Sequence, residues 1–153
     1  MWVRFLDEWN TPARKKHLLE QFLTTFAQDL ELGEIPRRGE GNVYELQLNP
    51  YTVIAIRALD PGISFWSRIG PCPQVRREEL FILLMKANFL GQGTGGGAIA
   101  LDENENFLTL SSVLPYDMNY KKFKDALEDF TNYLDYWKEE LLRHKKAADD
   151  NLL

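Results

Sequence analysis

The chain has 153 residues, of which 44% are hydrophobic and 12% aromatic, a composition that excludes an intrinsically disordered protein and indicates a single folded domain. Its net charge of −5 and its scattered basic residues argue against a nucleic-acid-binding protein, and its single cysteine, Cys72, rules out an intrachain disulfide and fits a reducing cytosol. No apolar run reaches the roughly 18 residues of a membrane span, and the charged Arg4 and Asp7 come too early for a signal peptide, so we expect a cytoplasmic protein without membrane insertion.

The first predicted element is a helix over 12–32. Thr11 is a helix-capping residue, Pro12 suits the first helical position, and apolar residues then recur at helical spacing until Gly33. The segment before this helix, 1–11, is interpreted as an N-terminal extension. A turn-rich loop follows the helix over 34–42.

Three segments with strand character come next. They are "VYELQLN" (43–49), "TVIAIRAL" (52–59) and "ISFWSRI" (63–69). The connections between them are so short that the three strands must form an antiparallel meander. The second strand is apolar on both faces, because Val53 and Ala55 alternate with Ile54 and Ile56. The face that carries Val53 and Ala55 is therefore either covered, by a loop or by the N-terminal "MWVRFL", or it binds an extended apolar peptide.

A second helix is predicted over 75–90, and it is apolar nearly all round. Its first apolar stripe consists of Leu80, Leu83, Leu84 and Ala87, and its second of Phe81, Met85 and Asn88, extended by Ile82 and Phe89. A helix in a two-layer domain is covered on one side only, so the second stripe is covered either by another part of its own chain or by another subunit, and we favour the subunit. We therefore expect a homodimer.

Two further strands, over 97–102 and 106–114, and a long helix over 118–146 complete the order α-β-β-β-α-β-β-α. This order predicts an α+β domain over 12–146, with a single antiparallel sheet and helices packed on it. The remaining residues, 147–153, are expected to form a flexible tail.

The segment "LGQGTGGG" between the second helix and the fourth strand contains five glycines, of which Gly91, Gly93 and Gly96 match G-x-G-x-x-G. A phosphate-binding loop leaves a strand and enters a helix, whose N-terminus then holds the phosphate. Here the order is reversed, so a phosphate would face the negative end of a helix. We therefore predict no nucleotide at this loop. We interpret Gly91 as a helix end, and the other glycines either as a flexible connector or as residues that let two backbones approach closely.

No catalytic set stands out elsewhere in the sequence. His17 and His144 fall on different predicted helices, and no zinc, calcium or nucleophile-elbow motif occurs. We predict no catalytic residues, no metal and no cofactor, and we expect that the protein is not an enzyme. Two alternatives stay open: an enzyme of unrecognised type that uses the glycine loop, and a non-enzymatic regulatory or protein-binding domain that acts on a folded partner.

Three stretches of the chain carry a family resemblance: "LLEQFLTTFAQDLEL" (18–32), "LFILLMKANFLGQGTGGGAIALDENENFLTLSSVLP" (80–115) and "FKDALEDFTNYLDYWKEEL" (123–141). In their order and spacing they resemble the class I type III secretion chaperones, the Tir-chaperone (CesT/SycE-like) family. The aromatic segment before Pro12 departs from the family pattern. Trp2 and Phe5 either cover the sheet or hold cargo.

The resemblance implies a cytoplasmic bacterial homodimer. It implies binding of the N-terminal segment of one or a few secreted effectors, which are held in extended form and kept soluble and ready for export. The secretion-system ATPase is a further implied partner, whereas nucleic acid, nucleotide and metal are not expected on the chaperone itself.

The resemblance also implies where cargo and a second subunit would bind. The predicted effector-binding residues are Phe22, Phe26, Leu30, Leu32, Val53, Ala55 and Phe65. The predicted dimer-interface residues are Phe81, Leu84, Met85, Asn88 and Ile99. Which face of each strand is buried stays open at this point.

Overall fold

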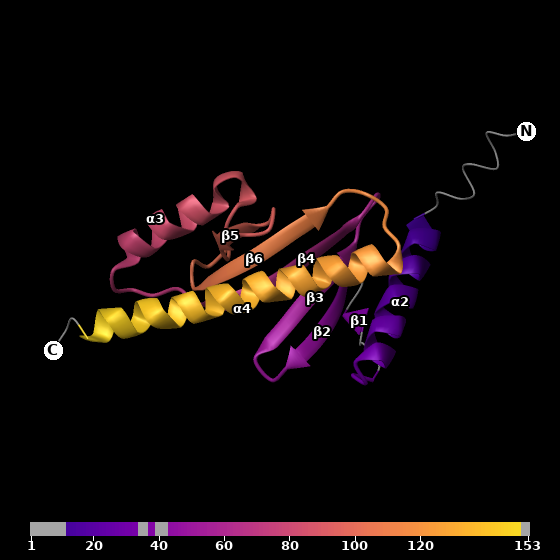
Figure 1. Ribbon diagram of the computed structural model, residues 1–153, viewed down its shortest axis with the longest axis horizontal. Helices are drawn as coiled ribbons and strands as arrows, with labels where there is room; N and C mark the ends of the chain where they lie inside the picture. The colour runs from indigo at the N-terminus through magenta and orange to yellow at the C-terminus, as the bar shows by residue number, and fades with distance from the viewer. Residues whose placement is uncertain (1–11, 34–36, 39–42, 151–153) are drawn as a thin grey trace, which may run out of the picture. The chain divides into compact units, whose positions relative to one another are not determined.

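A computed structural model of the protein describes residues 12–33, 37–38 and 43–150. The elements in chain order are α2 (Pro12–Asp29), β1 (Arg37–Arg38), β2 (Val43–Asn49), β3 (Thr52–Ala58), β4 (Ile63–Pro71), α3 (Arg77–Asn88), a 3₁₀ turn (Phe89–Gly91), β5 (Ala98–Leu101), β6 (Phe107–Leu114) and α4 (Tyr120–Asp150) (Figure 1). The predicted α+β class and element order are confirmed, with the short β1 as an addition inside the expected loop over 34–42.

The chain divides into two compact units. The first comprises the chain up to Ser64 together with Val113–Lys124, and the second comprises Phe65–Ser112 together with the chain from Asp125 onwards. The strands β4 and β6 and the helix α4 each supply residues to both units. The predicted extension 1–11 lies outside the described residues, as does 151–153, whereas 147–150 form the last turn of α4.

Hydrogen-bonded strands follow the order β1-β2-β3-β4-β6-β5. The pairs β1–β2, β2–β3 and β5–β6 are antiparallel, and in the last of these Ile99 lies opposite Leu110. In the second unit the N–H of Cys72, just after β4, donates a 2.8 Å hydrogen bond to the carbonyl of Asn106, just before β6. These two strands therefore also run antiparallel, and the predicted single antiparallel sheet is confirmed.

The core of the first unit lies between α2 and the strands β2 and β3. Its buried side chains recur at helical spacing on α2 and at alternate positions on the strands, and they include Leu19, Phe22, Leu23, Phe26, Tyr44, Leu46, Ile54 and Ile56. Phe123, in the first turn of α4, completes this core, with its ring centroid 5.5 Å from that of Phe22. The alternation on β2 and β3 thus buries one face and leaves the other exposed.

Helix α2 ends at Asp29, before the predicted stop at Gly33. The N–H of Leu32 donates to the carbonyl of Ala27 at 2.8 Å, and Glu31 takes the left-handed conformation with φ 55. This is the Schellman arrangement that closes many helices, here with glutamate at the position that glycine usually fills.

The core of the second unit forms between α4 and the strands β4 and β6. Phe65 lies against Phe130, with 5.5 Å between ring centroids, and the regular apolar stripe of α4 is buried. On β4 the alternation places Ser67 inside and Trp66 outside, so the serine is buried although the larger apolar ring is 41% exposed. The strand face that the sequence left open is thereby identified.

Candidate interaction surfaces

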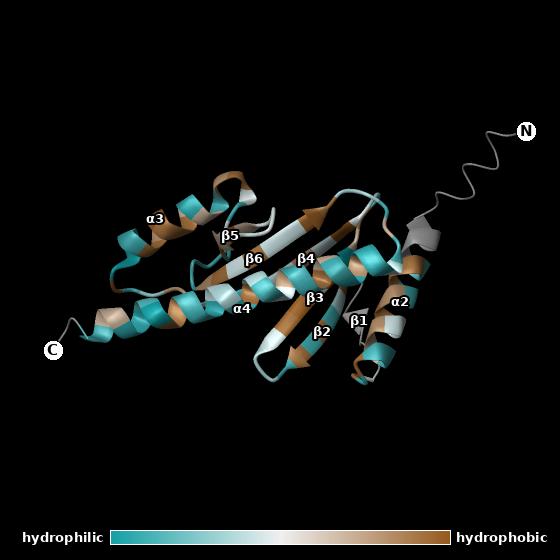
Figure 2. Ribbon diagram, viewed as in Figure 1, coloured by the Kyte–Doolittle hydropathy of each residue, from teal (hydrophilic) through white to brown (hydrophobic). Residues whose placement is uncertain are grey.

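Helix α3, in the second unit, carries apolar side chains on both its buried side and its exposed side. Those buried against their own unit are Leu80, Leu84 and Ala87. Five others are exposed, and together they are called the α3 surface: Ile82, Leu83, Met85, Phe89 and Leu90. Met85, Phe89 and Leu90 expose 72%, 64% and 78% of their area, and Figure 2 shows apolar residues along α3 and the turn that follows it. Single exposed apolar side chains are common, but a cluster of this size is typical of a protein interaction site.

The predicted dimer-interface residues differ in how their side chains are used. Met85 belongs to the α3 surface, and Phe81 is half-buried, with the guanidinium of Arg77 5.1 Å from its ring centroid. Leu84 and Ile99 are buried within the second unit, where they contribute to its core instead of its surface. Contact of Phe81 and Met85 with a second copy stays a prediction.

A groove of about 620 Å³ adjoins the α3 surface in the second unit. It is lined by Leu83, Lys86 and Ala87 of α3, by Gln92 and Gly93, and by Asn132, Tyr133, Tyr136 and Trp137 of α4. Leu83 belongs to both features, so the groove and the α3 surface are continuous. Much of its lining is aromatic or apolar, which is typical of a pocket that receives a side chain of a partner protein.

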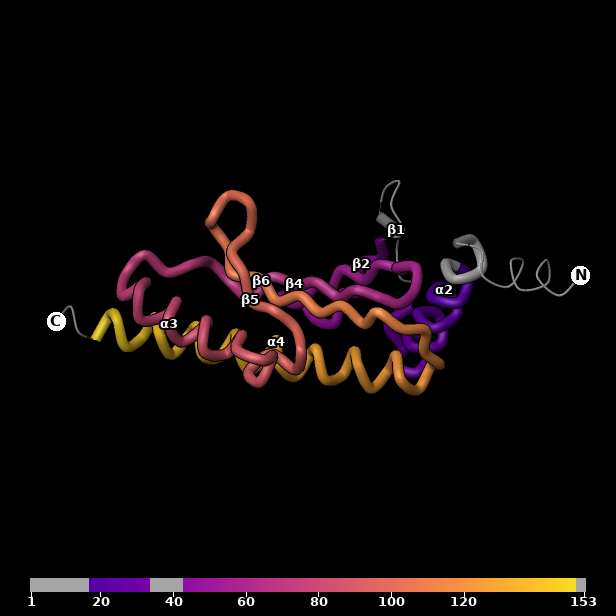
Figure 3. The backbone as a smooth tube through the Cα atoms, turned by 90° about the horizontal axis from the view of Figure 1, so that it is seen from above, coloured from indigo at the N-terminus to yellow at the C-terminus, as the bar shows by residue number. Residues whose placement is uncertain are grey.

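The glycine-rich segment folds back on the end of α3 (Figure 3). The N–H of Gly93 donates to the carbonyl of Ala87 at 2.9 Å, and the indole N–H of Trp137 donates to the carbonyl of Gly93 at 2.8 Å. A Cβ on Gly93 would lie 2.8 Å from Ala87, and one on Gly97 would lie 2.4 Å from the carbonyl oxygen of Ser111. The close backbone approach predicted for this segment is confirmed.

Asn88 joins the end of α3 to strand β5. Its Nδ2–H donates to the carbonyl of Ile99 at 2.9 Å, and the N–H of Ile99 donates to Asn88 Oδ1 at 2.8 Å. Thr94 makes a similar pair of hydrogen bonds with Gly97, two residues before Ile99. Its hydroxyl donates to the Gly97 carbonyl at 2.6 Å, and its own carbonyl accepts from the Gly97 N–H at 3.1 Å. The predicted interface residue Asn88 is therefore engaged within its own chain.

The outer face of β2 and β3 is exposed in the first unit. Val53 and Ala55 lie on it, opposite Gln47 and Glu45 respectively. Val53 is 40% exposed and Ala55 is half-buried. The polar side chains on β2 make this a mixed surface, less apolar than the β3 sequence alone suggests. The alternative that "MWVRFL" covers it, with Trp2 and Phe5, concerns residues outside the described part of the chain.

The other predicted effector-binding residues fall into two groups. Leu30 and Leu32, which follow α2, are exposed. Phe22 and Phe26 are buried in the core of the first unit, and Phe65 is only 1% exposed in the second. The resemblance selected these three rings as effector-binding residues, but their large area is already buried inside each unit. A direct role for them in cargo binding would require the cores to open.

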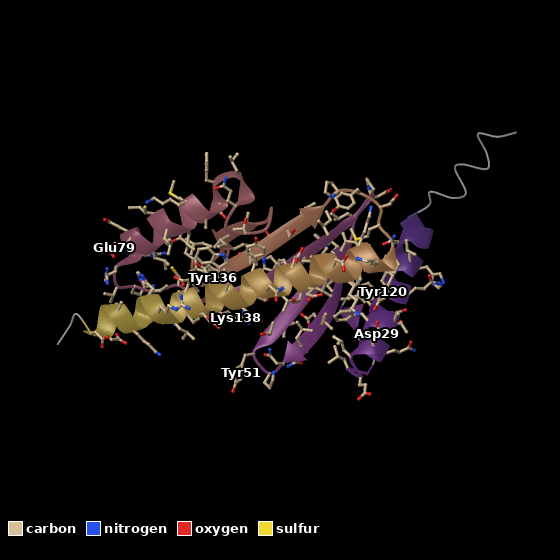
Figure 4. All side chains as sticks on the ribbon, in the orientation of Figure 1. Asp29, Tyr51, Glu79, Tyr120, Tyr136 and Lys138 are labelled. Carbon is tan, nitrogen blue, oxygen red and sulfur yellow. The ribbon has the colours of Figure 1, made fainter. Side chains whose placement is uncertain are left out.

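Two tyrosine–carboxylate hydrogen bonds hold α2 in the first unit. Tyr120, at the start of α4, donates to Asp29 Oδ2 at 2.6 Å, and Lys124 Nζ lies 3.6 Å from the same oxygen (Figure 4). Tyr44, on β2, donates to Glu20 Oε1 at 2.7 Å. Burial of the phenol and the neighbouring Asp29 carboxylate raise the pKa of Tyr120 to about 12, so this hydroxyl remains a donor at neutral pH.

Across the described ranges 12–33, 37–38 and 43–150, no three His, Cys, Asp or Glu side chains gather as a metal site requires. In the same part of the chain, no helix combines the length and the apolarity needed to cross a lipid bilayer.

Sequence reasoning missed two features of these surfaces. It placed Ile82 and Phe89 on an apolar stripe without selecting them as interface residues, although the all-round apolar character of the helix was the signal. It had no signal for Thr94, because the partner of this hydroxyl depends on how the glycine-rich segment folds.

A family match covers most of the chain. The model of the Tir chaperone protein (CesT) family matches residues 21–138. A protein of Chlamydia pneumoniae is 25% identical over 128 residues, which cover 81% of this chain and 96% of that protein.

Solved structures share the fold at low sequence identity. The ExsC–ExsE complex aligns with a TM-score of 0.66 and 14% identity, over 79% of this chain and 91% of the matched chain. The HopA1–SchA chaperone–effector complex aligns with a TM-score of 0.61 and 12% identity, over 81% of this chain and 95% of the matched chain. The ExoU–SpcU complex from the type III secretion system of Pseudomonas aeruginosa aligns with a TM-score of 0.58 and 18% identity, over 81% of this chain and 94% of the matched chain.

The match runs from within α2 to within α4 and includes every strand, the α3 surface and the glycine-rich segment. The fold agrees with that of the solved complexes. The chain belongs to the Tir chaperone protein (CesT) family.

Proposed function

We propose that this protein is a cytoplasmic chaperone of a bacterial type III secretion system, which binds the N-terminal segment of a secreted effector in extended form and keeps it soluble for export. The observation that carries the proposal is the family match over 21–138. The similarity of fold to a chaperone–effector complex and to a complex from a type III secretion system supports it. The activity is binding, with no catalytic step assigned to the chain.

The proposed working form is a homodimer joined through the α3 surface. Its five side chains lie on one helix and the turn after it, and burying apolar area contributes roughly 25 cal/mol per Å². Because a two-fold interface uses the same patch on both copies, the α3 surface of one copy would meet that of the other. The adjoining groove gives the second copy a pocket for a side chain.

The proposed dimer is tested by introducing a charge at position 85. Static light scattering should give twice the chain mass for the protein itself and the mass of one chain for Met85→Glu. Lys146→Gln is the matched control, since it changes the net charge by the same amount at an exposed position of α4 outside the α3 surface and the groove. An unmodified chain that stays monomeric throughout the concentration range used would overturn the proposed dimer.

Cargo is proposed to bind on the first unit, at the exposed apolar side chains there. These are Leu30 and Leu32 after α2, and Val53 with the half-buried Ala55 on β3. An unfolded segment loses conformational entropy when it binds, so several such contacts are needed to offset that cost. The net charge of −5 on the chaperone favours a basic cargo segment.

Binding is tested with the isolated N-terminal segment of an effector from the same organism. Calorimetry should detect binding of this unfolded segment, and Leu32→Asp and Val53→Asp should each weaken it about tenfold, the effect of losing one aliphatic contact. Gln21→Asp, which adds the same charge at an exposed position of α2 away from these residues, is the control that should leave affinity nearly unchanged. Binding only to a folded partner would favour a regulatory domain instead.

A secretion-system ATPase is a further proposed partner. This partner is tested by adding the ATPase to the complex of chaperone and effector segment.

A further inference from the structure

Strand β5 lies at one end of the strand order and pairs only with β6 among the described strands. An edge strand normally offers a row of unpaired N–H and C=O groups to any extended polypeptide. In an antiparallel pair, every second residue turns these groups away from its partner strand. By this alternation the outward positions are Gly97, just before β5, and Ile99 and Leu101 on β5, and the first two of these are already occupied.

The backbone of Ile99 is paired with a side chain in place of a strand. The Asn88 carboxamide receives the Ile99 N–H at 2.8 Å and donates to the Ile99 carbonyl at 2.9 Å. A carboxamide has the same donor and acceptor groups as a peptide bond, so it can replace one residue of a neighbouring strand. Both outward groups of Ile99 are satisfied, and its side chain is buried.

The preceding outward position is closed in the same manner. Thr94 accepts the Gly97 N–H on its carbonyl and donates its hydroxyl to the Gly97 carbonyl. Thr94 is itself buried, and the close approach of Gly97 to Ser111 keeps the two strands in place behind it. Two consecutive outward positions of one edge are thus occupied by side chains or backbone from the segment that connects α3 to β5.

We propose that Asn88 and Thr94 close the β5 edge against an added strand, which makes Asn88 a specificity-determining residue for extended polypeptide. A strand that paired at these positions would first have to break the four hydrogen bonds that Asn88 and Thr94 make with Ile99 and Gly97. The glycine-rich segment has a function in this device, because its tight folding brings Asn88 opposite Ile99. This proposal goes beyond the proposed chaperone activity. The strand that Asn88 and Thr94 keep from pairing with β5 is the β5 strand of a second copy.

The test combines amide exchange with the mass of the free protein, so it does not depend on cargo binding. In the unmodified chain the Ile99 N–H should exchange as slowly as amides inside the sheet. Asn88→Ala should speed this exchange at least about tenfold, and its mass by light scattering should rise with concentration above that of the unmodified protein. Asn104→Ala, in the exposed β5–β6 turn, is the matched control and should change neither result.

A second variant keeps the proposal falsifiable if Asn88→Ala does not fold. Asn88→Asp preserves the shape and the acceptor oxygen, so the Ile99 N–H should stay protected, but the donor to the Ile99 carbonyl is lost and the mass should again rise with concentration. Fast exchange of Ile99 in the unmodified chain would overturn the proposal. So would an unchanged mass in a folded variant whose edge has been opened.

Discussion

Gly95 lies against the ring of Tyr133 in the second unit, so closely that a Cβ on Gly95 would come within 2.5 Å of Cε2. Gly96, the next residue, has nothing within 4 Å of the same position. Both glycines have positive φ, 62 and 84 respectively. The two positions therefore separate the conformational requirement for glycine from the steric one.

Alanine substitution at these two positions should give unequal losses of stability. Gly96→Ala should cost about 1 kcal/mol, for the left-handed conformation alone. Gly95→Ala should cost a further 1–3 kcal/mol or so, because the Tyr133 ring must move to admit the methyl group. Urea unfolding followed by circular dichroism measures both. Equal losses would show that the close approach to Tyr133 carries no energy.

Removal of the Tyr120 hydroxyl should loosen the attachment of α2. Tyr120→Phe breaks the 2.6 Å hydrogen bond to Asp29 and keeps the ring that packs near Phe123. We expect a loss of about 1–2 kcal/mol in the free energy of unfolding, as for a partly exposed hydrogen bond to a carboxylate. Tyr116→Phe, at an exposed tyrosine of the same unit, should change stability by less than about 0.5 kcal/mol. If both variants lose the same amount, the hydrogen bond is not the cause.

The same tyrosine should give the protein a stability that depends on alkaline pH. Its pKa is raised in the folded state to about 12, because burial and the nearby Asp29 disfavour the phenolate. A raised folded-state pKa stabilises the fold below the unfolded value of about 10, and this contribution is lost as pH rises towards about 12. Unfolding free energies measured across this range should fall more steeply for the unmodified protein than for Tyr120→Phe. Parallel curves would contradict the assignment.

The end of α2 offers a stabilising substitution. Glu31 has φ 55, a conformation that glycine adopts without strain. Glu31→Gly should raise the free energy of unfolding by about 0.5–1 kcal/mol. Gln28→Gly, one turn earlier in the regular helix, should lower it by a similar amount, about 0.5–1 kcal/mol. Thermal unfolding of the two variants decides the matter, and a destabilised Glu31→Gly would show that the glutamate side chain makes a contribution of its own.

Periodicity predicted the elements whose burial is one-sided. The stripe of α4 that contains Phe123, Leu127 and Leu134 repeats every three or four residues, and all three are buried as expected. Helix α2 was located by the same means, but its end was placed too late because Gly33 is the nearest obvious stop signal. The actual stop uses Glu31, which no propensity rule favours at a left-handed position.

The candidate surfaces were harder to predict, because apolar character does not distinguish a core side chain from an interface side chain. Phe65 and Met85 are both apolar residues in apolar segments, yet the first is buried and the second is the most exposed large apolar side chain of its helix. Only the packing of neighbouring elements decides between the two outcomes. The pairing of Asn88 with Ile99 was equally invisible, since it depends on a connection whose glycines permit many paths.

Helix α4 supplies residues to both cores and follows all the other described elements along the chain. Phe123 belongs to the core of the first unit, and Leu127 and Leu134 belong to that of the second. During translation, the aromatic rings of α2 and the buried face of β4 therefore leave the ribosome well before the helix that covers them. Neither core is complete on a nascent chain that lacks α4, so both cores wait for the synthesis of the same helix.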